Sequence, residues 1–199
     1  GRTQFAGGLN FSVEINASDT HRKKYLYSHQ LNRIYVDIKM NFPVQFRWDF
    51  DRGMTTMFVR ATAVFSDDSQ AEKRVERCLQ HRHESTNAGM STSAIVMNVL
   101  HSSREPGTQD VFYCGEPAVP DSWYSVLLRF DARTQEPHSH AYQFVCKNSC
   151  SSGINRRAID IIFTLEDHTL MRKSHVSIWV CSGINRRAID IIFTLEDHT

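Results

Sequence analysis

The sequence lacks the long apolar run that a membrane-spanning helix requires, which is about 18 consecutive residues. Its opening residues, GRTQFAGGLN, contain no apolar segment of a secretory signal, so we expect 1–10 to form a flexible lead-in. It also lacks an excess of charge of either sign, because 23 basic and 22 acidic residues leave a net charge of +1. Any attraction to nucleic acid must therefore come from local clusters of basic residues. These absences predict a soluble protein.

Cysteines are few and odd in number, which argues against a disulfide framework. The five are Cys78, Cys114, Cys146, Cys150 and Cys181. Without a secretory signal, unpaired cysteines favour a reducing, intracellular compartment.

The sequence also lacks the motifs of common enzyme classes. Neither a Gly-rich phosphate loop nor a nucleophile elbow is present. The zinc deaminase pattern, His-x-Glu followed by Pro-Cys-x-x-Cys, is absent too, and Glu84 is the only candidate general base near a potential metal ligand. We therefore do not expect an enzyme, and a zinc enzyme is the weakest of the functions considered.

What the chain does contain is the composition of one globular domain: 199 residues, 41% hydrophobic and 23% charged. Short segments rich in β-branched and aromatic residues alternate with turn-forming stretches, a pattern typical of an antiparallel β-sandwich or barrel. We predict strands at 33–40, 57–65, 93–100, 122–130, 140–146, 158–165 and 175–181. The only predicted helix is 69–81, where charged residues interleave with Val75 and Cys78. The predicted fold class is all-β.

An internal repeat is present: SGINRRAIDIIFTLEDHT occupies 152–169 and occurs again, unchanged, at 182–199. Solenoid repeats diverge and recur several times, so one verbatim copy does not indicate a solenoid. An amphipathic strand such as 158–165 has one place in a sandwich, so the second copy has no evident partner strand. We expect the domain to span 11–181 and 182–199 to lie outside its native core, as a recent duplication or a sequence artefact.

Two pairs of residues are spaced for joint metal binding. Cys78-x-x-His81 and Cys146-x-x-x-Cys150 offer three thiols and an imidazole, a donor set that suits tetrahedral zinc. Two such pairs on distant segments would fix the geometry of two loops. From spacing alone the alternative stays open, with the thiols as buried apolar groups and His81 at the surface, because the intervals match no standard zinc finger. Four protein ligands would form a closed structural site.

Two basic clusters are candidates for contacts with an anionic partner. Arg156 and Arg157 closely follow the second cysteine pair, so an ion that ordered the cysteines would also order these arginines. The sequence HRKK at 21–24 is a second cluster, suited to phosphate or base-edge contacts. Each cluster has the plain alternative of a solvated surface.

Four segments point to a known family: YSHQLNRIYVDIKMNFPVQF, ERCLQHRHE, CKNSCSSGINRRAIDIIFTLED and HVSIWVC. In this order and at these intervals they resemble the DNA-binding core of the p53 tumour-suppressor family of transcription factors. The resemblance covers 11–181, in a divergent version such as an invertebrate one. It implies an immunoglobulin-like antiparallel β-sandwich with zinc-tethered loops and a short helix. It also implies duplex DNA as partner, self-association on DNA in the full-length protein, and a nuclear location with a cytoplasmic pool.

The resemblance implies roles for individual residues as well. Four match the family's ligands for one structural zinc ion: Cys78, His81, Cys146 and Cys150. Arg157 matches an arginine that braces the loops, and the resemblance implies a carboxylate partner such as Glu72 or Glu76. The DNA-contacting residues that it implies are Arg156 in the minor groove, Ser149 on a phosphate, and Arg22, Lys23 and Lys24 as candidates for a base-contacting lysine.

The sequence departs from the family at its C-terminal end. Trp179 stands where the family has a phosphate-binding arginine, and the repeat at 182–199 follows Cys181 where the family has a basic major-groove helix. Arg186 and Arg187 copy the loop arginines in sequence only. An alternative function is therefore a protein-binding domain of the same fold, with weak and non-specific DNA binding.

Overall fold

The computed structural model describes residues 7–15, 25–28, 30, 33–49, 53, 55–90, 92–134, 137–168, 172–180 and 188–193. At residue 33, and in the ranges 172–180 and 188–193, it describes the backbone only.

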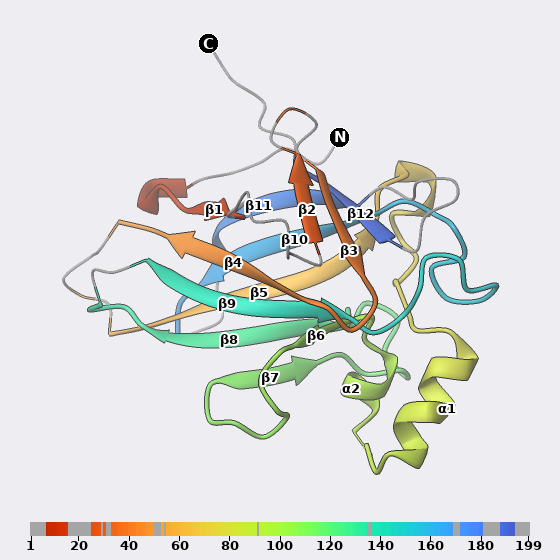
Figure 1. The fold of residues 1–199 in the computed structure, drawn as a ribbon. Helices are drawn as coiled ribbons and strands as arrows, with labels where there is room; N and C mark the ends of the chain where they lie inside the picture. Colours follow the sequence, from red (N-terminus) through yellow and green to blue (C-terminus); the bar gives the residue numbers. More distant parts are fainter. Residues whose placement is uncertain are drawn as a thin grey trace.

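The chain folds into two antiparallel sheets that form a sandwich (Figure 1). The smaller sheet has the strand order β1 (Ser12–Glu14), β4 (Asn41–Arg47), β9 (His138–Phe144) and β6 (Leu100–Ser102). The larger sheet has the order β2 (Tyr25–Ser28), β3 (Arg33–Asp37), β12 (Ala188–Phe193), β11 (Arg172–Val180), β10 (Ile159–Glu166), β5 (Thr56–Phe65), β8 (Ser125–Asp131) and β7 (Val111–Cys114). This arrangement confirms the predicted all-β sandwich.

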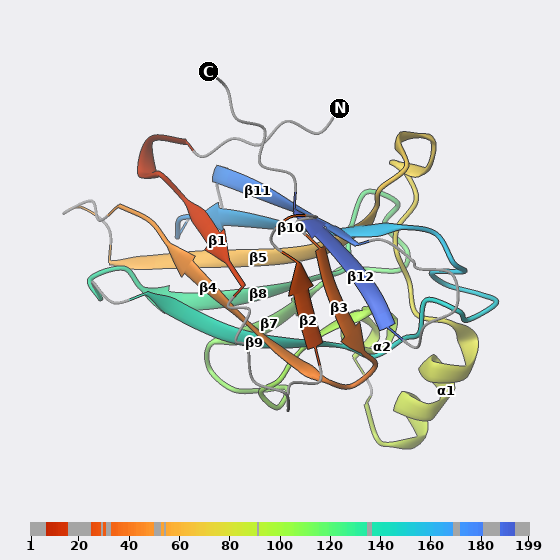
Figure 2. The same cartoon turned by 45° about the horizontal axis from the view of Figure 1, so that its top comes forward.

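The helical segments are short: η1 (Gly7–Leu9), η2 (Asp68–Gln70), α1 (Leu79–Asn87) and α2 (Ser93–Met97). Both α-helices belong to the connection between β5 and β6 and lie together at one end of the sandwich (Figures 1 and 2). In the part of the chain that the structure describes, no helix has the length and apolar character needed to cross a membrane.

The core lies between the sheets and contains many aromatic side chains. Exposed or partly exposed residues alternate with buried ones along β4, so that Phe42, Val44 and Phe46 are buried. Phe46 packs against Phe163 of β10, with ring centroids 5.3 Å apart. Burying one such side chain contributes roughly 1.5–3 kcal/mol to stability. These contacts hold the sheets against each other, and the loops at the sheet ends depend on that frame.

The strand predicted at 93–100 is wrong, because this stretch forms α2 followed by the start of β6. An apolar run of this length has no periodicity that separates a helix from a buried strand. The carbonyl of Thr92 accepts the N–H of Val96 at 3.1 Å, which closes a helical turn. Ala94 and Leu100 are nevertheless buried, so the apolar run still serves the interior.

The helix predicted at 69–81 is wrong over most of its length. Only η2 is helical near its start, and α1 begins at Leu79. Between them Arg74 forms an antiparallel bridge with Val64, and the N–H of Arg77 donates to the carbonyl of Met97 at 3.0 Å. Tertiary hydrogen bonds thus outweigh local helix propensity here. As a result Cys78 precedes a helix instead of lying within one.

Strand β4 was not among the predicted strands, because Pro43 interrupts its pattern. Strand β1 pairs only with 45–47, so Pro43 has a neighbouring strand, β9, on one side only. A proline is tolerated at such a position, since no second ladder needs its missing N–H.

The second copy of the repeat takes a place in the larger sheet. Strand β12 lies between β3 and β11 (Figure 2), where its register sets Ile191 opposite Ile34 and Ile189 opposite Val36. Both residues of β3 are buried. The expectation that the second copy finds no partner strand is therefore wrong for Ala188–Phe193. The assignment of 182–199 outside the native core stays a prediction.

We expect a chain truncated after Cys181 to keep cooperative thermal unfolding, because the described buried side chains form one cluster that extends from Phe11 to Leu165. Its melting temperature should lie within about 4 °C of that of the 199-residue chain, the shift that ~1 kcal/mol produces at this size. Calorimetry on both chains measures the difference. Loss of cooperative unfolding would show instead that β3 and β11 require the strand between them.

Candidate metal centre

Cys78 and His81 are brought together by the start of α1. Cys78 is the residue that caps the helix: its backbone is extended, with φ −67° and ψ 158°, and its sulfur accepts the N–H of His81 at 3.5 Å. Residues three apart on a helix lie on the same face, so both side chains point the same way. Both are buried.

Cys146 and Cys150 lie on the loop that follows β9. Cys146 comes two residues after the strand ends, and the N–H of Cys150 donates to the carbonyl of Lys147 at 3.2 Å, which closes a turn. The sulfur of Cys146 also accepts the N–H of Cys78 at 3.4 Å. This bond joins the loop to the segment before α1.

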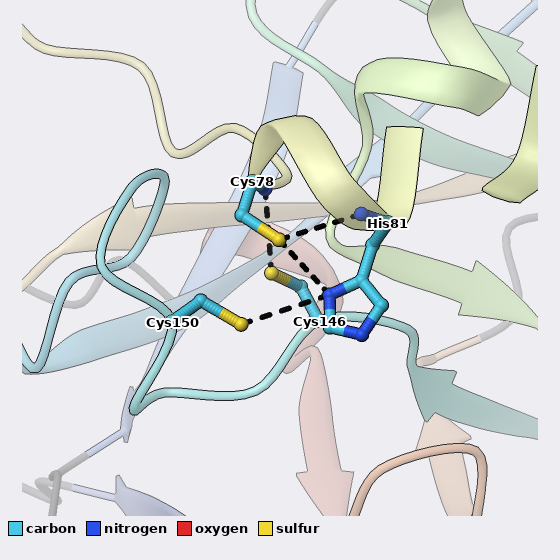
Figure 3. Close-up of side chains that lie close together, drawn as sticks. All are labelled: Cys78, His81, Cys146 and Cys150. Atoms are coloured by element: carbon cyan, nitrogen blue, oxygen red, sulfur yellow. Dashed lines mark hydrogen bonds between the residues drawn. The ribbon is translucent and has the colours of Figure 1, made fainter. Parts of the chain in front are cut away.

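The four side chains converge on one point (Figure 3). Their ligand atoms all lie within 4.8 Å of one another. Nδ1 of His81 is 3.0 Å from the sulfur of Cys78 and 3.6 Å from that of Cys150. In tetrahedral zinc sites, neighbouring donor atoms are about 3.5–3.8 Å apart, given the usual zinc–sulfur and zinc–nitrogen lengths. The cluster that the sequence predicted is therefore assembled, and it can hold a metal ion.

Burial favours the neutral forms of three groups in the cluster. It raises the pKa of the Cys146 thiol and of the Cys150 thiol, and it lowers the pKa of His81. Near pH 7 these groups are therefore neutral unless a positive charge ionises the thiols. A divalent ion supplies that charge, and its binding releases the thiol protons.

Arg77 lies beside the cluster and is a residue that sequence reasoning missed. It is only 3% exposed, and its guanidinium donates to the carbonyls of His81 at 2.7 Å and Val96 at 3.4 Å. Burial lowers its pKa, while the nearby sulfurs of Cys146 and Cys78 act in the opposite direction. A divalent ion held by three thiolates and one imidazole has a net charge of −1, which the guanidinium complements. No sequence signal marks Arg77, because its partners are backbone carbonyls, which every residue has.

At Gly153 the backbone of the loop after β9 lies against the backbone of the segment before α1. Its φ is +74°, and a Cβ placed on it would lie 2.5 Å from the carbonyl oxygen of Glu76 and 2.8 Å from the nitrogen of Cys78. Ser152 adds a further link, since its hydroxyl accepts the N–H of Leu79 at 3.3 Å. Both loops are thus in direct contact beside the metal cluster.

Arg157 contacts the interior of the loop and the η2 segment. Its guanidinium donates to the carbonyls of Gly153 and Ile154 and to the side chain of Gln70, at 3.4 Å for the last bond. It also lies 3.8 Å above the ring of Phe65. The implied carboxylate partner is therefore wrong in the described contacts: Glu76 pairs with arginines of its own segment, and Glu72 is exposed. The loop-bracing role of Arg157 stays a prediction.

Arg156 and Ser149 lie at the surface of the same loop. Arg156 has a left-handed backbone with φ +59°, which costs an ordinary side chain roughly 1–2 kcal/mol. Its N–H donates to the carbonyl of Asn148 at 2.7 Å, and this bond helps to hold the conformation. The loop therefore presents Arg156 next to the turn that bears Ser149. Their DNA contacts stay predictions.

The side chains of the remaining predicted residues are not described. Arg22, Lys23 and Lys24 lie outside the described residues, as do Cys181 and the second arginine pair. Trp179 lies on β11, where its backbone is opposite Asp160 on one side and Ile192 on the other.

We expect Gly153→Ala to destabilise the domain more than Gly107→Ala does. Both glycines have positive φ, but only Gly153 has backbone atoms where the new Cβ would lie, whereas Gly107 has open space. Gly107→Ala should therefore cost about 1 kcal/mol for the left-handed backbone alone. Gly153→Ala should cost more, because the two loops must separate. Denaturant unfolding compares the variants, and equal losses of stability would contradict the close approach.

The comparisons with known proteins agree with this geometry. Residues 1–183 match the P53 DNA-binding domain. The chain is also similar to proteins called cellular tumor antigen p53 from three fishes. It is 26% identical to that of Oryzias latipes over 170 residues, or 85% of this chain and 46% of the relative. It is 26% identical to that of Platichthys flesus over 183 residues, or 90% and 47%. For Oncorhynchus mykiss the identity is 27% over 186 residues, or 90% and 45%.

The chain thus spans about half the length of these relatives. The domain that it matches is a DNA-binding module and not an enzyme. The chain belongs to the p53 DNA-binding domain family.

Proposed function

We propose that this chain is the sequence-specific DNA-binding domain of a transcription factor of the p53 type. The observation that carries the proposal is the cluster of Cys78, His81, Cys146 and Cys150, which ties the loop of Ser149 and Arg156 to the sandwich. A cation on a fixed loop loses less ordering entropy when it binds a phosphate or enters a groove. Control of the cell cycle, stress response and apoptosis is the wider role that we infer for the full-length protein. Self-association on DNA and a nuclear location with a cytoplasmic pool belong to the same proposal.

We further propose that the metal is one structural zinc ion. Two of its ligands lie before and within α1, and two lie in the loop after β9, so the ion would link two segments that are distant in the sequence. Glu84, the only candidate base, is exposed and accepts a hydrogen bond from Gln80 at 3.2 Å. A closed set of four ligands without an adjacent base supports a structural role and not catalysis.

Removal of zinc should lower the melting temperature and loosen the loop at 146–157, because the binding energy of a structural ion is partly folding energy. Cys150→Ser should lose the ion. Cys114→Ser is the matched control, since Cys114 is a free thiol on β7 outside the cluster, and it should keep the ion. Metal analysis and thermal unfolding measure both effects. Natively purified protein without zinc would rule out this assignment.

Arg156→Ala should remove much of the affinity for duplex DNA with little change in melting temperature, because the side chain is exposed and we assign it to the minor groove. Arg157→Ala should lower the melting temperature as well, because it removes the hydrogen bonds to the carbonyls of Gly153 and Ile154 and the contact with the ring of Phe65. Titration of labelled duplex DNA and thermal unfolding separate the two roles. Unchanged affinity in Arg156→Ala would refute its assignment.

The alternative is a protein-binding domain with weak, non-specific DNA binding. The observation that favours it is the second copy of the repeat, which follows Cys181 and includes β12. A well-read base pair contributes about 1–3 kcal/mol of discrimination, most of it in the major groove. The ratio of affinities for a specific site and for scrambled DNA decides between the two functions. A ratio near one, with salt-sensitive binding retained, favours the alternative.

A further inference from the structure

Two lysines lie beside the metal cluster and have no part in it. Lys39 is at the turn between β3 and β4, where its backbone is left-handed with φ +61°. Its N–H donates to the carbonyl of Phe144, the last residue of β9, at 2.7 Å. The turn is therefore anchored to the strand that leads directly into Cys146, and the exposed side chain of Lys39 begins from a fixed point.

Lys147 follows Cys146 immediately and is exposed as well. Its carbonyl accepts the N–H of Cys150 at 3.2 Å, so its backbone is part of the turn that sets the spacing of the two cysteines. The same turn contains Ser149. Lys147 is thus placed between a metal ligand and a residue that we assign to a phosphate.

The charges around the cluster leave both lysines without a counterion. Among the residues that the structure describes, neither ammonium group forms an ion pair with a carboxylate. Lys147 directly follows the ligand Cys146, and the backbone of Lys39 is hydrogen-bonded to Phe144, two residues before Cys146. The buried guanidinium of Arg77 already complements the net charge of −1 of a zinc-loaded cluster. Two exposed positive charges therefore remain on this part of the surface.

We propose that Lys39 and Lys147 contact backbone phosphates of duplex DNA and extend the surface formed by Ser149 and Arg156. This inference rests on the proposed function and adds two residues to its interface. Phosphate contacts of lysine are independent of base sequence, so the pair adds affinity and register without specificity. The fixed backbone at both positions keeps the ordering cost low, because only the side chains must be immobilised.

The experiment measures affinity for one duplex over a range of salt concentrations, with 199-residue chains loaded with zinc. The slope of log affinity against log salt falls by about 0.9 for each phosphate contact that is lost. Lys39→Gln and Lys147→Gln should each show that loss, and the double variant should show both. Lys147→Arg should keep the slope, since the charge and reach are retained.

Arg104→Gln is the matched control for loss of one positive charge. Arg104 is exposed, follows β6, and has no carboxylate partner among the described residues. Its segment pairs with Ala141, away from the end of β9 that leads to Cys146. The slope should be unchanged in this variant. An equal change in Arg104→Gln would show an effect of net charge alone and would overturn the inference.

Three further results are decisive. If the parent chain binds DNA and the double lysine variant keeps its slope, the inference is wrong while the proposed function stands. If the lysine variants lose zinc, the lysines serve the metal cluster and the inference is wrong. If the parent chain shows no salt-dependent DNA binding, the proposed function itself fails. Zinc content and melting temperature, measured on every variant, distinguish these cases.

Discussion

The close approach of two segments, 76–81 and 146–157, is the constraint on which the candidate interface depends. Their backbones meet at Gly153, and the N–H of Cys78 donates to the sulfur of Cys146. The aromatic core holds the sheets together, but it does not extend to the exposed tips of these loops. A shared metal ion would therefore fix their relative position and with it the direction in which Arg156 leaves the surface. The proposed function therefore predicts that loss of this contact lowers both stability and affinity for DNA.

The basic residues near the metal cluster fall into two groups that differ in contacts and exposure. The guanidinium groups of Arg77 and Arg157 donate to backbone carbonyls, and that of Arg157 also lies over the ring of Phe65. These contacts are made within the domain. Arg156, Lys147 and Lys39 are exposed, so water and dissolved salt screen their charges. The described contacts thus separate arginines whose guanidinium groups donate to backbone carbonyls from basic residues whose side chains are exposed.

The sequence predicted the parts that depend on local pattern. Period-2 segments such as Thr56–Phe65 and Ile159–Glu166 are strands. The spacing of the two ligand pairs left two interpretations open, and only the family resemblance predicted the cluster. The errors arise where tertiary contacts decide. An apolar run at 93–100 contains a helix because it packs across an end of the sandwich, and Gln70 replaces a carboxylate as partner of Arg157. Arg77 gave no signal at all, since carbonyl partners have no sequence identity.

The two copies of the repeat show why sequence identity does not determine position in a sheet. Both pair with β11, from its two edges, but in different registers: Phe163 lies opposite Val176, whereas its counterpart Phe193 lies opposite Ile178. The two registers are therefore offset by two residues along β11. The pairing of β12 with β11 is confined to Phe193 and Ile192, whereas with β3 it extends from Ala188 to Ile192. The described pairing of the second copy is therefore longer with β3 than with β11.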